Sequence, residues 1–199
     1  MLLDRVFRLT FRNLSTLFLL VATVSVPLHL GYGIVFWDVV EVRELHDEIE
    51  DFPSHVAVNG VGQDDLRVAR ATLAGVFAVE LGLILLLTRA VSRIIDVDEA
   101  GGVPTVLDGW SHIRSPTGRP TGPGISIFLI TFAFSVAAGI LAYRLLASIT
   151  DLLSGGVFVL ASQLDLAAAI ALGAPFALVG WVVGARSAKA KEPGVPTLY

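Results

Sequence analysis

An acidic residue, Glu80, stands near the centre of a long apolar stretch, residues 69–89, and is the side chain best placed to do chemistry in a membrane. It is the one charged residue among the 17 from position 71 to position 87. An unpaired charge at the centre of a bilayer costs ~2.5–3.5 kcal/mol even on a lenient insertion scale, so this carboxyl must be neutral or paired. Acids at such depth commonly couple the movement of protons or ions, and Glu80 is therefore a candidate functional residue.

The ionisable partner for Glu80 in the preceding apolar stretch is His29, which follows Pro27. Two consecutive membrane helices run antiparallel, and the distances of His29 and Glu80 from mid-span differ by only a few residues, at ~1.5 Å each. A second interpretation, which we favour for the histidine, is that it bonds a backbone carbonyl that Pro27 leaves free. Hydroxyl groups of a later stretch are alternative partners for the acid: Thr131, Ser135 and Tyr143. In each case we predict that Glu80 is buried within the monomer and hydrogen-bonded to another helix.

No other set of residues has the spacing of a known catalytic or metal site. The absence of cysteine excludes disulfides, thiolate metal sites and cysteine nucleophiles. Within the acidic segment 38–68, His46 with Glu50 and Asp47 with Asp51 have a spacing that could hold a divalent ion, but acidic runs on helices are usually solvated faces. We therefore predict no catalytic residue, no metal site and no cofactor, and expect that the protein is not an enzyme.

The apolar stretches themselves predict an all-α membrane protein. Hydrophobic residues make up 54% of the chain and its mean hydropathy is +0.75, whereas soluble domains are ~45–50% apolar. Four stretches are long enough to cross a hydrocarbon core of ~30 Å, and we predict a four-helix bundle with spans at about 14–37, 69–88, 125–147 and 164–184. The first stretch could also be a signal peptide, but its apolar run exceeds the ~7–15-residue core of such signals, so a retained helix is favoured.

Two segments flank the predicted membrane domain of residues 14–184. Residues 1–13 place Arg5, Arg8 and Arg12 at i, i+3 and i+7, with apolar side chains on other faces. This pattern is typical of an amphipathic basic helix that lies on an anionic membrane surface. Residues 185–199 are predicted to be a cytoplasmic tail.

Small residues recur at one spacing along three of the four predicted spans, where close packing of helices depends on small side chains. The three stripes are Ala71, Gly75, Ala78 and Gly82; Thr131, Ser135, Ala138 and Ala142; and Gly173, Ala177, Gly180 and Gly184. We predict that these stripes are helix–helix interfaces of a compact bundle. At ~100° per residue, the first stripe points away from Glu80, so other helices would have to cover both faces of the second span.

Charge is distributed unevenly between the predicted loops. If both termini and residues 89–124 lie on one side, that side holds ten of the 14 basic residues, and the other side holds 11 of the 18 acidic ones. Basic residues near membrane helices concentrate in the cytoplasm. We therefore predict a multi-pass protein of the plasma membrane with both termini cytoplasmic.

Two segments carry a resemblance to a known family: DRVFRLTFRNLSTLFLLVATVSVPL at residues 4–28 and TRAVSRIIDVDEAGGVPTVLDGW at residues 88–110. They resemble a broad polytopic family that includes the membrane domain of some glycerophosphodiester phosphodiesterases, together with stand-alone relatives. The shared features are an aromatic and basic start, a small polar break and a proline-bearing span. No phosphodiesterase catalytic domain is present, so the resemblance implies a membrane protein and transfers no enzymatic residue.

These observations favour a non-catalytic scaffold or accessory subunit over two alternatives. The first alternative is a small transporter or channel component that uses Glu80, and the second, least favoured, is an intramembrane enzyme. The expected partners are the lipid bilayer and either other membrane subunits or a second copy of the chain. No feature predicts binding to nucleic acid.

Overall fold

The computed structural model describes residues 2–37, 63–114, 120, 123–154 and 160–189, and all regular structure in these ranges is α-helical. The helices are α1 (Leu2–Arg12), α2 (Leu14–Val35), α6 (Gln63–Glu99), α7 (Val106–Ser111), α8 (Pro123–Ser154) and α9 (Ala161–Lys189). Four of them contain segments long and apolar enough to cross a membrane: Leu14–Val35, Arg67–Glu99, Gly124–Thr150 and Ala161–Ser187. The prediction of an all-α, multi-pass membrane bundle is confirmed.

Three helices extend beyond the boundaries expected from hydropathy. Helix α8 continues to Ser154 instead of ending near residue 147. Helix α6 continues to Glu99 and ends where Gly101 adopts φ +81°, a conformation that favours glycine, so residues 89–99 are helix rather than loop. Helix α9 begins at Ala161, which places Gln163 in its first turn rather than in a loop. The possible ion ligands of the acidic segment, His46, Asp47, Glu50 and Asp51, lie outside the described residues.

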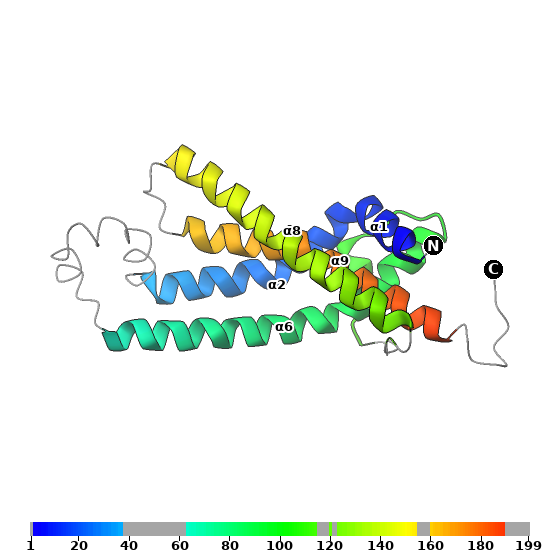
Figure 1. Ribbon diagram of the computed structural model, residues 1–199, viewed down its shortest axis with the longest axis horizontal. Helices are drawn as coiled ribbons and strands as arrows, with labels where there is room; N and C mark the ends of the chain where they lie inside the picture. Colours follow the sequence, from blue (N-terminus) through cyan, green and yellow to red (C-terminus); the bar gives the residue numbers. More distant parts are fainter. Residues whose placement is uncertain (1, 38–62, 115–119, 121–122, 155–159, 190–199) are drawn as a thin grey trace.

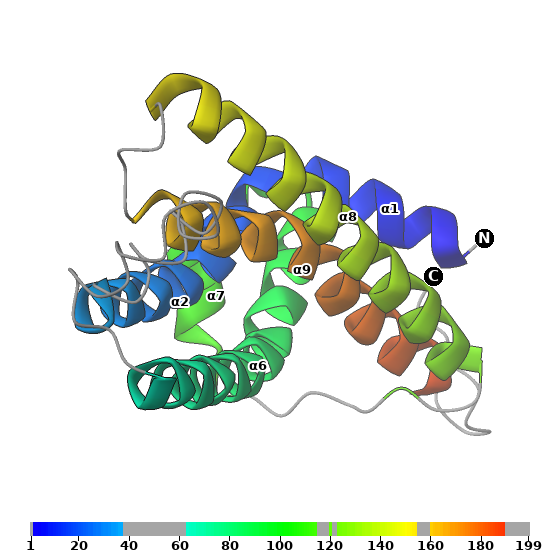
Figure 2. The same ribbon diagram turned by 60° about the vertical axis from the view of Figure 1, so that its left-hand side comes forward.

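The four long helices alternate in direction, as Figure 1 shows. Helix α1 and the last turns of α9 lie at one end of the bundle, which we call the terminal end. The start of α6, the end of α2 and the start of α9 lie at the opposite end. Helix α8 crosses α9 obliquely and diverges from the bundle toward that opposite end (Figures 1 and 2).

Helix α9 is the centre of the bundle. In the most apolar window of each helix, 61% of α9 is buried, against 39% of α2, 17% of α6 and 11% of α8. It packs on α8, α2, α6 and α1. The main hydrophobic core lies toward the terminal end and joins four helices through these buried side chains: Val6, Leu9, Leu17, Leu20, Val21, Leu87, Val91, Ile94, Leu178, Val179 and Val182.

The basic helix α1 is docked on the bundle. Val6, Leu9 and Thr10 are buried. The ring of Phe7 lies 4.9 Å from that of Phe134 on α8 and 5.8 Å from that of Phe176 on α9, centroid to centroid. The side chains of α1 that stay exposed include Arg8 and Arg12 but also Phe11, so its open surface is mixed rather than purely basic.

Candidate functional site

Three helices bring one buried polar side chain each to a common point. His29 of α2 lies between Glu80 of α6 and Gln163 of α9, and these three residues, here called the polar triad, are each at least 98% buried. Atom Nε2 of His29 is 3.1 Å from Glu80 Oε2, and Nδ1 is 3.4 Å from Gln163 Oε1. The predicted burial of Glu80 and its hydrogen bond to another helix are confirmed.

The favoured interpretation of His29 was wrong. Both ring nitrogens face side chains of other helices, so neither is used on a backbone carbonyl freed by Pro27. Of the alternative hydroxyl partners, Thr131 bonds Ile127 O and Phe128 O of its own helix, 2.9 Å away in each case. The physical reason is that α8, which carries all three hydroxyl candidates, packs on α9 and has almost no contact with α6 among the described residues, whereas α6 packs on α2 and α9.

A glycine of α2 makes the triad possible. Gly33 lies one turn after His29, and a Cβ built there would be 2.6 Å from Leu160 Cδ2 and 3.2 Å from Gln163 Cγ. Because Gly33 has no side chain, the first turn of α9 can approach α2 closely enough for Gln163 to reach the imidazole. The ring of Phe77 packs edge-on against His29, with centroids 5.5 Å apart. Gln163 precedes the predicted fourth span, 164–184, and the sequence pattern identifies neither Gln163 nor Gly33 as part of a site.

The hydrogen-bonding roles in the triad follow from what each atom can do. An amide oxygen only accepts, so Gln163 Oε1 requires a proton on Nδ1 of His29. The other contact needs one shared proton, either on Glu80 as a neutral acid donating to Nε2, or on Nε2 of an imidazolium donating to the carboxylate. Both forms have no net charge, which removes most of the cost of placing an acid in lipid.

One atom of the triad has no hydrogen-bond partner. Glu80 Oε1 is buried and makes no hydrogen bond in the described part of the chain. The arrangement can therefore hold one exchangeable proton and retains one free acceptor. Among the described residues there is no group of three His, Cys, Asp or Glu that could hold a metal ion.

The small-residue stripe of α9 packs against α8, as predicted. A Cβ built at Gly173 would lie 2.6 Å from Ser135 O, one at Gly180 would lie 2.8 Å from Thr131 Cβ, and one at Gly184 would lie 2.7 Å from Gly124 O. All three are distances that real Cβ atoms almost never adopt. The backbones of α8 and α9 thus approach each other as closely as glycine permits.

The stripe of α6 does not pack within the monomer, and that prediction was wrong. Gly75, Ala78 and Gly82 are all exposed. A Cβ built at Gly75 or Gly82 would meet nothing within 4 Å. The reason is that α6 turns Glu80 toward α2 and α9, which leaves the opposite face, with the stripe, on the outside.

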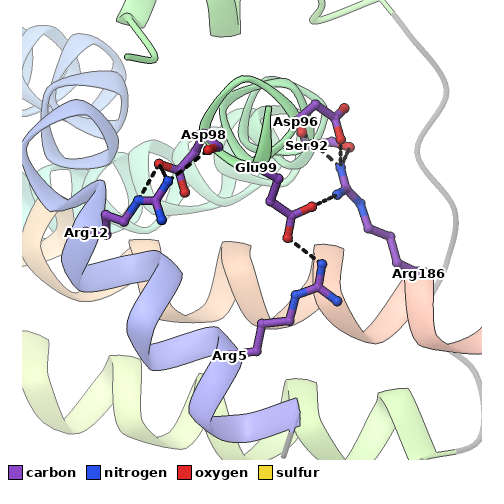
Figure 3. A network of polar contacts seen from close by, with 7 residues as sticks. All are labelled: Arg5, Arg12, Ser92, Asp96, Asp98, Glu99 and Arg186. Atoms are coloured by element: carbon purple, nitrogen blue, oxygen red, sulfur yellow. Dashed lines mark hydrogen bonds and ion pairs between the residues drawn. The ribbon is translucent and has the colours of Figure 1, made fainter. Parts of the chain in front are cut away.

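Charged residues form a second polar region at the terminal end (Figure 3). Arg12 of α1 donates from Nε to Asp98 Oδ1 at 2.7 Å and from Nη2 to Asp98 O at 2.8 Å. Arg5 pairs with Glu99. On the other side of α6, Arg186 of α9 donates to Asp96 Oδ1 at 2.6 Å and pairs with Glu99 Oε2 at 3.5 Å. The acidic end of α6 is thereby tied to both α1 and α9.

Comparison of the chain with protein-family models, with curated proteins and with solved structures found no match. The family resemblance of residues 4–28 and 88–110 accordingly stays a prediction.

Proposed function

We propose that the chain is a non-catalytic scaffold or accessory subunit of the membrane, which docks another membrane helix on α6. The observation that carries the proposal is the open stripe of α6, Ala71, Gly75, Ala78 and Gly82. The same spacing on α9 forms a close interface with α8 inside this molecule. In lipid there is little hydrophobic drive for helices to associate, so a small-residue face that permits close approach is a physical basis for binding.

Single cysteines test this proposal cleanly because the chain has none of its own. Gly75→Cys and Gly82→Cys should form an oxidative or bifunctional cross-link at one defined size in native membranes. Leu81→Cys is the matched control, because Leu81 is 55% exposed and lies about a quarter turn from the stripe. A product at twice the mass of the chain identifies a second copy, and another defined mass identifies a different subunit. Equal, diffuse cross-linking at all three positions would contradict the proposal.

The same proposal includes a location in the plasma membrane with both termini in the cytoplasm. It is supported by the basic residues at the terminal end, where α1 carries Arg5, Arg8 and Arg12 and α9 carries Arg186. Cysteines placed at Arg114 and at Asp47 test the orientation. An impermeant thiol reagent should label the cysteine at position 47 in intact cells and the cysteine at position 114 only after lysis. The reverse pattern would overturn the orientation.

A small transporter or channel component is the second candidate function, favoured by the free, buried oxygen Oε1 of Glu80. A carboxyl with one committed and one free oxygen can accept and release a proton without leaving its partner. Proteoliposomes holding the wild-type chain should then show a proton or cation flux that Glu80→Gln abolishes. Identical flux in both, or none in either, would remove this candidate and leave the scaffold proposal intact.

A further inference from the structure

A polar cavity of about 360 Å³ lies at the terminal end, between α1 and the end of α6. Its walls are mostly charged: Arg5, Arg8, Arg12, Asp98 and Glu99. Figure 3 shows four of these side chains, with the guanidinium groups of Arg5 and Arg12 reaching from α1 toward α6. The cavity thus lies beside the end of the membrane-crossing segment Arg67–Glu99, where α6 meets α1 (Figure 1).

The charges of the cavity wall do not balance. Arg5 pairs with Glu99 and Arg12 with Asp98, but Arg8 forms no ion pair with any residue in the described ranges. Asp4, one turn before Arg8, is not part of the wall and does not pair with it. Among these wall residues, three cations and two anions give a net charge of +1 within the described part of the chain.

The arginines also have hydrogen-bond donors to spare. A guanidinium has five N–H groups, and the contacts of Arg5 use only Nη2 while those of Arg12 use Nε and Nη2. Within the described residues, Arg5 Nε and Nη1, Arg12 Nη1 and the guanidinium group of Arg8 have no hydrogen-bond partner. Arginine forks match the oxygens of phosphate in charge and geometry, and basic pockets beside membrane helices suit phospholipid headgroups.

We propose that this cavity binds a phosphodiester of single negative charge, the chemistry of an anionic phospholipid headgroup, with Arg8 as its principal ligand. One such group neutralises the net positive charge of the cavity wall, and its oxygens accept hydrogen bonds from the unused arginine N–H groups. Binding leaves the ion pairs of Arg5 and Arg12 in place, so the acidic end of α6 stays tied to α1. The site is independent of whether α6 docks a partner.

The test measures lipid retention by the full-length chain in mild detergent, using native mass spectrometry with added phosphatidylglycerol or phosphatidylcholine. We expect one phosphatidylglycerol per chain, retained in preference to phosphatidylcholine. Arg8→Gln should weaken its retention about fivefold, the change that corresponds to the ~1 kcal/mol of an arginine near an anionic surface. Arg114→Gln is the matched control, because Arg114 is exposed and outside the cavity. Among the described residues Arg8 makes no ion pair or side-chain hydrogen bond, so the variant should fold as the wild type does, which its thermal unfolding will verify.

A second arm separates a lipid from a soluble source of the same group. Glycerol phosphate and inorganic phosphate are titrated against bound phosphatidylglycerol. Failure to displace it supports the lipid as the occupant, whereas displacement that Arg8→Gln weakens keeps the phosphate site and assigns it to a soluble ligand. An equal loss of phosphatidylglycerol retention in Arg8→Gln and Arg114→Gln would overturn the proposal. So would the absence of any preference for phosphatidylglycerol over phosphatidylcholine in the wild-type chain.

Discussion

Two helix faces with the same sequence pattern have opposite surroundings in this protein. On α9, Gly173, Gly180 and Gly184 are pressed against the backbone and side chains of α8. On α6, Gly75 and Gly82 face open space. The two faces have nearly the same spacing of small residues, so the pattern alone does not determine which of them is buried.

The difference shows how each helix is held. Helix α8 is attached to α9 through close backbone contact, which depends on the absence of side chains. In its outer half, α6 is attached by polar contacts: Glu80 bonds His29, and the hydroxyl of Tyr32 donates to Ala69 O at 3.3 Å. Near the terminal end it joins the apolar core through Leu87, Val91 and Ile94. A small-residue face therefore permits an interface, whereas a polar residue in lipid requires one.

The largest effect is expected from filling the buried face. Gly180→Leu places a branched side chain where even a Cβ would lie 2.8 Å from Thr131 Cβ, so the free energy of unfolding should fall by about 3 kcal/mol or more. Gly75→Leu is the matched change on the open face of α6 and should leave the free energy of unfolding nearly unchanged. Reversible unfolding in mixed detergent measures both. Similar losses in the two variants would mean that the faces do not differ as described.

The second prediction tests whether the polar triad holds α6. Glu80→Ala or His29→Ala leaves the other member buried and unpaired, and each should lower the free energy of unfolding by about 2 kcal/mol. This value lies between the ~3–5 kcal/mol of broken buried ion pairs and the ~0.6 kcal/mol of an average hydrogen bond between membrane helices. The double variant should lose less than the sum of the two, and full additivity would indicate that the contact contributes nothing.

A smaller effect is expected from narrowing the space that Gln163 uses. Gly33→Ala adds a Cβ 2.6 Å from the end of Leu160, a flexible side chain, so the loss of unfolding free energy should be about 1 kcal/mol. Gly31→Ala, two residues earlier in the same helix, meets nothing within 4 Å and should be neutral or slightly stabilising. Histidine nitrogen chemical shifts from NMR should change in the first variant only. Unchanged shifts in Gly33→Ala would show that Gln163 does not bond the imidazole.

The smallest effect concerns α7, which covers the terminal half of α6 where Gly109 packs near Ala90. At the start of α7, hydrogen bonds from the side chain and then the backbone of Thr105 lower the pKa of Asp108 below its ordinary 3.8. Because the pKa of Asp108 is lower in the folded state than in the unfolded state, its ionised carboxylate stabilises the folded state. This stabilisation is complete above the ordinary pKa and is lost as pH falls through the lowered pKa. Thr105→Val removes the side-chain hydrogen bond and keeps the backbone one, so it should reduce that acid-side loss of α7 docking, as followed by Trp110 fluorescence. A pH profile identical to that of the wild type would contradict this role of the cap.

Several features of the site were predictable because they depend on local composition. A single acid within an apolar helix must find a polar partner, and alternating helix directions bring His29 to the depth of Glu80. Gln163 was missed because hydropathy marks where a helix becomes apolar, and α9 begins with the polar residues Ser162 and Gln163 just before its apolar run. Nor does the sequence reveal that Gly33 makes room for that side chain.

The sequence by itself determined that the chain is helical, how many helices can cross a membrane and that Glu80 must turn inward, because these depend on the transfer of each side chain between water and lipid. The tertiary structure alone decided that α9 is the central helix and that the stripe of α6 lies outside. Lipid solvates all apolar helix faces about equally well. Which face of a helix is buried in the bundle therefore depends on how three or more helices pack together. The same holds at the terminal end, where Arg5 and Arg12 meet Asp98 and Glu99 only because α1 folds back onto the bundle.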